Sequence, residues 1–326
     1  MKSYSMRVEG AAAVLQLTDL PQPEPGAKQI LLRMHAAGLN RGEFIPGGLI
    51  KAGAAKPAGI EGAGEIVALG GGVTHLHVGQ RVMGRCPGAF SDYAAMDVHE
   101  AMPVPAGLSM EAAAAVPLTF LVVHDMLVTQ GRLQAGEWLL ITGVSSGVGV
   151  AALQAAKAIG AKVIGTSGSA EKLARLKALG LDVGICTRAP DFNEAVMAAT
   201  GGKGVNLVIN TVGGSVFAEC VKSLAFEGRL ATVGYVDGQL KAEIDIQALH
   251  AKRLTLFGVS NKLRTPEQRA AGVPAFVTDW LPLFASGRLQ PLVDRVFPFN
   301  DLPAAQAHMQ ANRHLGKIVL RIAEAA

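Results

Sequence analysis

The sequence of 326 residues contains little cysteine and few aromatic residues. Aromatic residues make up 5% of the chain, and alanine and valine supply much of its 50% hydrophobic content. The three cysteines, Cys86, Cys186 and Cys220, lie far apart and in no spacing that is typical of a metal site. An odd number of scattered cysteines excludes a disulfide framework and is typical of a protein in a reducing compartment.

The sequence also lacks a long hydrophobic run and a signal-peptide pattern at its N-terminus. Its most apolar window, residues 112–123, is shorter than the roughly 20 residues that a membrane-spanning helix needs, and it contains Pro117. We find no repeats, low-complexity tracts or blocks of like charge. These absences predict a globular, cytoplasmic protein without a membrane partner.

The sequence also has little excess of charge of one sign, since the formal net charge is +4 and the basic residues are scattered. This distribution does not favour a nucleic-acid partner, although a basic rim would suit an anionic cofactor. The length of the chain leaves room for two domains with sizeable hydrophobic cores.

Residues 143–149 form a glycine-rich turn at the centre of a β-α-β pattern. The apolar runs 139–142 and 162–166 predict strands that are buried on both faces. Small and apolar residues at helical spacing predict a helix over 150–159, which Gly160 ends. Strand, turn, helix and strand in this order predict a dinucleotide-binding site.

The turn contains three glycines and two serines. Small residues let the backbone approach a pyrophosphate, and the N–H groups from about Gly147 onward would face that anion at the positive end of the helix dipole. On the G-x-G-x-x-G template, Val144 and Ser146 replace the first two glycines, and only Gly149 is retained. The alternative is a tight turn in an α/β protein that binds no nucleotide.

The end of the second strand indicates which nucleotide would bind. An NAD site usually places Asp or Glu there to hold the ribose hydroxyls, whereas residues 166–169 read Thr-Ser-Gly-Ser. Hydroxyls together with a cation would bind a 2′-phosphate, which a carboxylate would repel. The sequence therefore predicts NADP(H), with Lys172 as the cation. A solvated helix face is the alternative for Lys172 and for Arg175.

The N-terminal part of the chain has a different pattern. Short apolar segments separated by glycine and proline predict a compact, barrel-like β domain. The predicted strands are residues 5–8, 13–17, 29–35, 59–69, 78–84 and 90–94. A long apolar helix over 118–130 would then lead into the second domain.

In the second domain, strands and helices alternate up to residue 259, as in a parallel doubly wound sheet. Helices over 266–286 and two last strands would then rejoin the first domain. The predicted fold class is α/β. A β-barrel domain is formed by residues 1–121 and 260–326, and a Rossmann domain with a doubly wound parallel sheet is formed by residues 122–259.

Further motifs occur in a fixed order along nearly the whole chain. They are AAGLNRGE (36–43), GIEGAGEIVALGGGV (59–73), PLTFLVVHDML (117–127), NLVINTVGG (206–214), GRLATVG (228–234), GRLQPLVDRVFPF (287–299) and GKIVL (316–320). Together with the β-α-β segment, the chain resembles the medium-chain dehydrogenase/reductase superfamily, in its zinc-independent quinone oxidoreductase (zeta-crystallin-like) branch.

This resemblance implies a GroES-like catalytic domain made from both ends of the chain, with a Rossmann domain inserted between them and the active site in the cleft. It also implies hydride transfer from NADPH to a small electron-poor acceptor, such as a quinone or an α,β-unsaturated carbonyl. A homodimer is a further expectation of the resemblance.

The resemblance allows a zinc site to be tested. Zinc-dependent members place a Cys where Asn40 stands and a His where Ile60 stands, and they carry a separate lobe with four closely spaced cysteines. A catalytic zinc needs about three N, S or O ligands, so this chain is expected to bind no metal. Glu61, the companion acid of the zinc site, is expected to be a structural hydrogen-bonding residue.

The resemblance also implies cofactor contacts. Asn40 would lie at the nicotinamide end, where its amide could donate to a carbonyl or a ribose hydroxyl, and an Asn turn after a strand is the alternative. The other implied contacts are Ser145, Ser146, Gly147 and Val148 at the pyrophosphate, Ser167 and Lys172 at the 2′-phosphate, Arg188 at the adenosine, Val233, Gly234 and Tyr235 near the nicotinamide, and Arg313 and Lys317 from the catalytic domain. Arg188 is alternatively solvated, and Tyr235 is either a lid or a packed loop residue.

The chain departs from the branch near the expected substrate pocket. The branch often has a Tyr where this chain has Ile45, and a Thr near the nicotinamide is replaced by Val122. Thr119, one helical turn earlier, is the expected substitute and joins Asn40 as a candidate catalytic residue. His124 is a candidate general acid, although we prefer to read it as a packed helix residue. The loop 44–58 would border the pocket.

The sequence therefore predicts a zinc-independent, NADPH-dependent reductase that transfers hydride to a quinone or a small α,β-unsaturated carbonyl. The protein would position the reactants, and water would supply the proton. An enoyl-thioester reductase of the same superfamily is one alternative, against which the absence of Tyr at residues 40–50 counts. Another is an NADPH-binding protein with a structural or regulatory role and little turnover.

Overall fold

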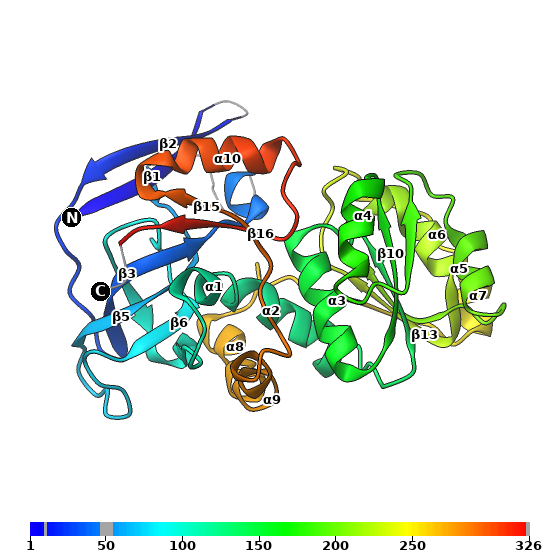
Figure 1. Cartoon of the computed structure of the whole chain (residues 1–326), viewed down its shortest axis with the longest axis horizontal. Helices are drawn as coiled ribbons and strands as arrows, with labels where there is room; N and C mark the ends of the chain where they lie inside the picture. Colours follow the sequence, from blue (N-terminus) through cyan, green and yellow to red (C-terminus); the bar gives the residue numbers. More distant parts are fainter. Residues whose placement is uncertain (10–11, 46–54, 324–326) are drawn as a thin grey trace. The chain divides into compact units, whose positions relative to one another are not determined.

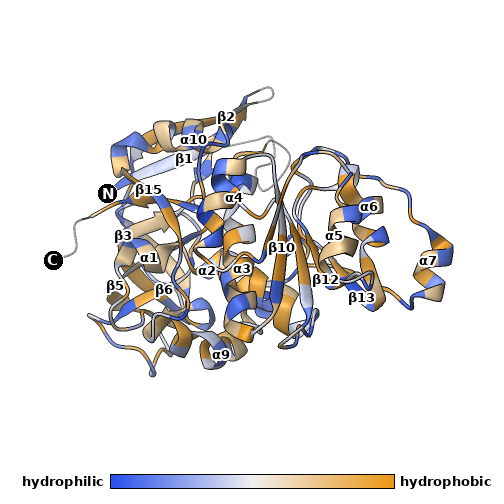
Figure 2. Cartoon of the chain, turned by 45° about the vertical axis from the view of Figure 1, so that its right-hand side comes forward, coloured by the Kyte–Doolittle hydropathy of each residue, from blue (hydrophilic) through white to orange (hydrophobic). Residues whose placement is uncertain are grey.

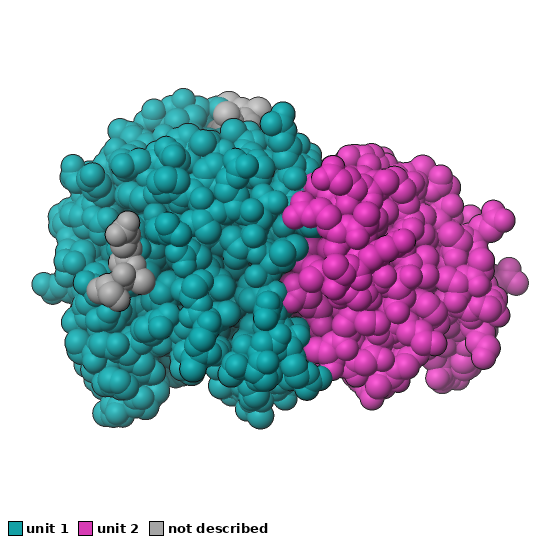
Figure 3. All heavy atoms as spheres, viewed as in Figure 1, with its two compact units in different colours: residues 1–121, 264–326 teal, residues 122–263 magenta. Residues whose placement is uncertain are grey.

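The computed structural model describes residues 1–9, 12–45 and 55–323 (Figure 1). The chain forms two compact units, which we call unit 1 (residues 1–121 and 264–326) and unit 2 (residues 122–263), as coloured in Figure 3. Within the three described ranges, no helix combines the length and the apolar character needed to cross a membrane.

Unit 1 contains a three-stranded sheet and a seven-stranded sheet, and both ends of the chain contribute strands. The smaller sheet has the order β2-β1-β4, and the larger has the order β15-β16-β3-β5-β6-β8, with β7 paired to β3. The strands are β1 (Lys2–Glu9), β2 (Ala12–Asp19), β3 (Gln29–Gly38), β4 (Lys56–Pro57), β5 (Glu61–Leu69), β6 (Arg81–Arg85), β7 (Tyr93–Asp97), β8 (Met102–Pro103), β15 (Val293–Pro298) and β16 (Lys317–Arg321).

The long strand β3 lies at the centre of unit 1, because it pairs with β5, β7 and β16. Its residues Ile30, Leu32 and Met34 have no exposed surface, which is typical of a strand in the middle of a core. In the antiparallel pairing with β16, Gly38 lies opposite Val319. This register brings the residues that follow β3 close to the residues that begin β16.

Helices complete unit 1. They are α1 (Met110–Ala114), α8 (Pro266–Ala270), α9 (Val273–Ala285), α10 (Leu302–Gln310), η1 (Arg41–Phe44), η2 (Val98–Glu100) and η5 (Phe299–Asp301). Aromatic rings from α9 pack in the core, where the Phe120 ring lies 6.4 Å from Trp280 and 5.0 Å from Phe284, each edge to face. Such pairs stabilise a core beyond the area that they bury.

Unit 2 is a six-stranded parallel sheet in the order β11-β10-β9-β12-β13-β14. The strands are β9 (Trp138–Thr142), β10 (Lys162–Ser167), β11 (Val183–Cys186), β12 (Val205–Asn210), β13 (Leu224–Thr232) and β14 (Thr255–Gly258). The chain reverses direction across the sheet between β9 and β12, and ligands bind at such a switch point in doubly wound folds. The predicted α/β class and the doubly wound parallel sheet are confirmed.

Helices cover both faces of this sheet (Figure 1). Helices α3 (Gly147–Ile159) and α4 (Ala170–Lys177) lie on one face, and α5 (Asn193–Ala199) and α6 (Phe217–Lys222) lie on the other, with α7 (Ile246–Ala251) beyond them. In α4, Leu173 and Leu176 are buried while the hydrophilic residues, blue in Figure 2, face outward. This amphipathic pattern explains why a charged segment packs as a helix.

The helix that we predicted over 118–130 is not uniform. It consists of the α-helix α2 (Pro117–His124) followed by a π-helical turn, η3 (Asp125–Thr129). There the N–H of Gln130 donates to the carbonyl of Asp125 at 2.9 Å. A continuous apolar run does not reveal which carbonyl each N–H will use, so this change could not be predicted from the pattern. Helices α7 and α10 and the short turn η4 (Gly214–Val216) were also not predicted.

Candidate functional site

The turn between β9 and α3 is built as a helix start. Ser146 is the N-cap residue of α3, and its Oγ accepts a hydrogen bond from Gly149 N at 3.1 Å. The helix therefore begins at Gly147, three residues before the predicted start. Because the first N–H groups of a helix have no acceptor within it, those of Gly147 and Val148 remain available to an anion at the positive end of the dipole.

Close packing explains the glycines of this turn. A Cβ on Gly149 would lie 2.6 Å from the carbonyl oxygen of Gly143 and 2.7 Å from the backbone of Val144. Gly143 itself has a φ of 66° and a Cβ there would lie 2.6 Å from Thr211 Oγ1. The turn can lie close against the helix and the sheet only because these positions have no side chain.

Side chains gather at the end of β10, beside this turn. Ser145 Oγ lies 3.1 Å from Ser167 Oγ, so two of the hydroxyls predicted to contact the cofactor are hydrogen-bonded to each other. The side chain of Arg188 passes over Gly168, where any Cβ would collide with it. The structure thus brings Ser145, Ser167 and Arg188 together at one edge of the sheet. Two hydroxyls and a guanidinium without a carboxylate suit a phosphate.

Lys172 lies in the first turn of α4, next to this group. Its backbone N–H donates to Ser169 Oγ at 3.3 Å, and Ser169 is the N-cap residue of the helix. The residue is half-buried, whereas Arg175, one turn further on, is exposed. This difference favours Lys172 over Arg175 as the cation of the site.

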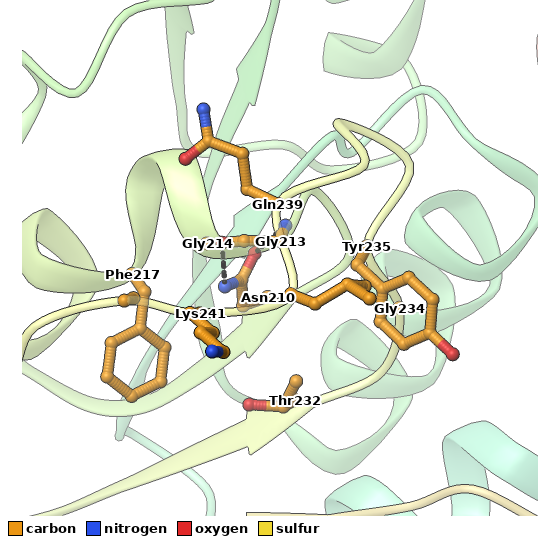
Figure 4. Close-up of a pocket in the computed structure, with 11 residues that line it drawn as sticks. Asn210, Gly213, Gly214, Phe217, Thr232, Gly234, Tyr235, Gln239 and Lys241 are labelled. Carbon is orange, nitrogen blue, oxygen red and sulfur yellow. Dashed lines mark hydrogen bonds between the residues drawn. The ribbon is translucent and has the colours of Figure 1, made fainter.

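A pocket of about 480 Å³, which includes space open to solvent, lies at the carboxyl ends of β12 and β13 (Figure 4). Its lining residues are Asn210, Gly213, Gly214, Phe217, Thr232, Gly234, Tyr235, Gln239, Leu240, Lys241 and Ala242. Of the residues predicted near the nicotinamide, Gly234 and Tyr235 line this pocket, and Tyr235 is 58% exposed. Tyr235 is therefore a rim residue rather than a packed one.

A buried amide links this pocket to the phosphate turn. Asn210 Oδ1 accepts hydrogen bonds from Thr142 Oγ1 at 3.0 Å and from the N–H groups of Val212 and Gly213. Its Nδ2 donates to the Gly213 carbonyl at 2.9 Å, the dashed line in Figure 4. Thr142 is the residue before the glycine-rich turn. Its hydrogen bond to Asn210 therefore fixes the position of the turn relative to the pocket.

The second predicted site region lies in unit 1, around Asn40. Asn40 Nδ2 donates to Glu43 Oε1 at 3.0 Å and to Glu61 Oε1 at 2.8 Å. Lys317 Nζ donates to Asn40 Oδ1 at 2.8 Å and to Glu61 Oε1 at 2.7 Å. Glu61 Oε2 also accepts from the N–H of Leu118 at the start of α2, at 2.7 Å. We call Asn40, Glu43, Glu61 and Lys317 the amide cluster.

The amide cluster corrects two predictions. Both hydrogens of the Asn40 amide are already donated to carboxylates, so Asn40 has no N–H left for a substrate carbonyl. Lys317 is 5% exposed and its ammonium donates all three hydrogens within unit 1, so we no longer count it among the cofactor ligands. The expectation that Glu61 is a hydrogen-bonding residue is confirmed.

Glu43 is the residue of this cluster that the sequence analysis missed. It is 1% exposed, its Oε1 accepts from the backbone N–H of Asn40 at 3.0 Å as well as from the amide, and its Oε2 has no partner among the described residues. The pKa of Glu43 is raised to about 8, mainly because the side chain is buried; the hydrogen bond from the Asn40 side chain opposes this rise, and the charge of Glu61 adds to it. The spacing Asn-x-x-Glu, typical of a capped helical turn, was the available signal.

The remaining candidates in unit 1 are not part of the cluster. Thr119 is 3% exposed, so its hydroxyl is buried. Arg313 is exposed in the segment between α10 and β16. Arg41 donates to the Met309 carbonyl near the end of α10 and to Asn312 Oδ1 in this segment. Most of the loop predicted to border the pocket, residues 46–54, lies outside the described residues. Across the described ranges, no group of three or more His, Cys, Asp and Glu residues could hold a metal ion.

Comparisons with known proteins cover both units. A family model described as an alcohol dehydrogenase GroES-like domain matches residues 26–106, and one described as a zinc-binding dehydrogenase matches residues 147–272. The highly reducing polyketide synthase ALT1 of Alternaria alternata is 30% identical over 97% of this chain and 12% of its own length. A component of the phenolphthiocerol/phthiocerol polyketide synthase of Mycobacterium tuberculosis is 32% identical over 96% of this chain and 14% of its own length. The chain thus spans a small part of these relatives.

Solved structures are similar over almost the whole chain. Mycobacterial Rv1454c complexed with NADPH has a TM-score of 0.86 and 28% identity, and the match covers 99% of this chain and 100% of that one. The CurK enoyl reductase has a TM-score of 0.83 and 26% identity over 98% of this chain and 99% of that one. A mycobacterial quinone oxidoreductase has a TM-score of 0.84 and 28% identity over 99% of this chain and 100% of that one.

Proposed function

Because this chain belongs to the medium-chain dehydrogenase/reductase superfamily, we propose that it is an NADPH-dependent enoyl reductase, which reduces the carbon–carbon double bond of an α,β-unsaturated thioester. The observation that carries the proposal is the match of nearly the whole chain to short portions of polyketide synthases, one of them named highly reducing, together with its similarity to an enoyl reductase structure. This reading replaces the quinone as the first substrate class.

The residues of unit 2 fit a bound NADPH. The helix start at Gly147 and Val148 suits the pyrophosphate, and Ser167 with Lys172 and Arg188 suits the 2′-phosphate. No carboxylate stands at the end of β10, where an NAD site would need one. When bound, the reduced nicotinamide supplies a hydride.

The chain's own residues bind and orient the reactants. The thioester carbonyl makes the β-carbon of the double bond electron-poor, so the bond accepts a hydride there and a proton at the α-carbon. Val233 to Tyr235 follow β13, at the carboxyl edge of the sheet, where a doubly wound fold binds its ligands. We propose that the proton comes from water. The gain in rate then comes mainly from holding the two reactants in line.

The first experiment compares NADPH and NADH consumption with a crotonyl thioester and with a simple quinone as acceptors. The proposal predicts faster turnover of the thioester with NADPH, and a saturated thioester as the product. Turnover of the quinone alone would replace it with quinone reduction, the second candidate, which the similar quinone oxidoreductase structure favours. Tight NADPH binding without turnover of either acceptor would support a structural or regulatory role.

The cofactor preference has a separate test in Lys172→Asp. If Lys172 binds the 2′-phosphate, the substitution should raise the KM for NADPH by roughly tenfold or more and change that for NADH little, since a charge-assisted hydrogen bond is lost. Arg175→Asp is the matched control, because it makes the same charge change on the exposed face of the same helix. An equal rise of the KM for NADPH and for NADH in Lys172→Asp would contradict the assignment of Lys172 to the 2′-phosphate.

Two further properties belong to the proposal. We propose that the enzyme works without zinc, so a chelator should leave its activity unchanged, and a loss that added zinc restores would overturn this. We also propose a homodimer, which sedimentation of the purified protein would distinguish from a monomer.

A further inference from the structure

The amide cluster fixes the orientation of Asn40 through charge. Asn40 is half-buried, while the side chains of Lys317 and Glu61 are 6% and 0% exposed and Glu43 is fully enclosed. The Lys317 ammonium has three hydrogens, and its three acceptors are the Leu39 carbonyl at 3.0 Å, Asn40 Oδ1 at 2.8 Å and Glu61 Oε1 at 2.7 Å. It is therefore held in one place.

The amide of Asn40 has only one orientation that fits these neighbours. Its NH₂ group faces oxygens of Glu43 and Glu61, and its oxygen faces the ammonium. Turning the amide over would set its oxygen against the Glu61 carboxylate and its NH₂ group against the Lys317 ammonium, so that the hydrogen bonds with both charged groups would be lost. Buried groups without partners are costly, because the low dielectric strengthens both attraction and repulsion.

We propose that Lys317 is a positioning residue, which holds the Asn40 amide so that, among the residues that the structure describes, an oxygen lone pair is its only hydrogen-bonding group without a partner. An amide oxygen can accept two hydrogen bonds, and Lys317 provides one of them. Asn40 then recognises a hydrogen-bond donor, such as a hydroxyl or an amide N–H of the bound cofactor or substrate, and it does not donate to the substrate carbonyl. The placement of Asn40 at the reacting groups is what the family resemblance implies, so this inference rests on the proposed function.

The orientation can be tested without activity. In the ¹H–¹⁵N spectrum of the whole protein, the two side-chain amide protons of Asn40 should exchange slowly with solvent, because each is held by a carboxyl group. The assignment comes from the signal that is lost in Asn40→Leu. Fast exchange of these protons would overturn the proposal whether or not the enzyme reduces enoyl thioesters.

A double-mutant cycle tests whether Lys317 acts through Asn40. Asn40→Leu and Lys317→Met should each lower kcat/KM by roughly tenfold, the value of one hydrogen bond lost in a site, and the double variant should lose no more than Asn40→Leu alone. Additive losses would mean that Lys317 has a structural role separate from Asn40, and would overturn the proposal. If the enzyme turns over no acceptor, the affinity for NADPH replaces kcat/KM in the cycle.

Arg321→Met is the matched control for this cycle. This substitution removes a cation from the same strand, β16, and breaks the ion pair between Arg321 and Glu111. The side chain of Arg321 is 51% exposed. The substitution should therefore leave kcat/KM within about twofold of the original value, since exposed ion pairs contribute little. If Lys317→Met does not fold, the exchange of the Asn40 protons in the unaltered protein still decides the question.

Discussion

The buried carboxyl of Glu43 should make unit 1 less stable as the pH rises, and Glu43→Gln should abolish that effect. Glu43 is 1% exposed, and its pKa is raised from an ordinary 4.5 to about 8 in the folded protein. Between these two values the folded state holds a proton that the unfolded state has released. Linkage then requires the free energy of unfolding to fall with rising pH, by about 1.4 kcal/mol per pH unit for one group.

The expected size of the effect follows from this slope. Glutamine cannot ionise, so from about pH 5.5 to about pH 7.5 the free energy of unfolding of the unaltered protein should fall by about 2.7 kcal/mol relative to that of Glu43→Gln. Other titrating groups are common to both proteins and cancel in the difference. The oxygen of the new glutamine side chain can keep both hydrogen bonds from Asn40, while its NH₂ group takes the place of Oε2, which has no partner in the described part of the chain. The absolute stability is therefore a weaker test than the slope.

The assay is urea unfolding at several pH values, followed by tryptophan fluorescence. The chain has two tryptophans, with Trp138 in unit 2 and Trp280 in unit 1. A Trp138→Phe background leaves Trp280 as the reporter of unit 1, which matters because two units need not unfold in one step. Glu24→Gln, at an exposed position, makes the same charge change as a control. Parallel curves for the Glu43→Gln and unaltered proteins would refute the reasoning, because Glu43 would then be ionised throughout.

Three other substitutions test the packing around the candidate sites. Gly168→Ala should raise the KM for NADPH without preventing folding, because the new methyl group displaces the exposed side chain of Arg188. An unchanged KM would mean that Arg188 does not contact the cofactor. Gly149→Ala should abolish cofactor binding in a titration, because its methyl has no space against the Val144 backbone. Phe120→Ala should lower the free energy of unfolding of unit 1 by about 3–5 kcal/mol in urea, since the ring is 1% exposed; a loss below about 1 kcal/mol would contradict the described core.

The dinucleotide fold could be predicted because its signals are local. The apolar strand, the glycine turn and the small-residue helix around Gly149 follow one another directly, so a short stretch of sequence contains all the residues that predict the fold. The same holds for the missing carboxylate at the end of β10. The glycine turn placed the first N–H groups of the helix at about Gly147, where the helix begins, whereas the apolar pattern alone began it at residue 150. The pattern began late because the start depends on the Ser146 hydroxyl, which caps the helix and is not apolar.

The amide cluster could be predicted only in part. Asn40 was found through a motif, but its orientation depends on Glu61 and on Lys317, which is 277 residues away. That contact exists because β16 pairs with β3 in a particular register. Nothing in the local pattern around Lys317 distinguishes a cation that binds a cofactor from one that holds a buried amide. The motifs therefore singled out Asn40 and Lys317, but they could not indicate which hydrogen bonds the two side chains make.

The pairing of β16 with β3 also sets an order of events during synthesis of the chain. Unit 2 consists of one continuous segment, residues 122–263, so all its strands have been made well before β16 appears. Glu61 is made early, but the ammonium that lies 2.7 Å from its Oε1 arrives only with Lys317. Until then a carboxylate at this place would have to be buried without a counter-ion, which is costly. A growing chain should therefore complete its cofactor-binding half first and close the Asn40 region almost last.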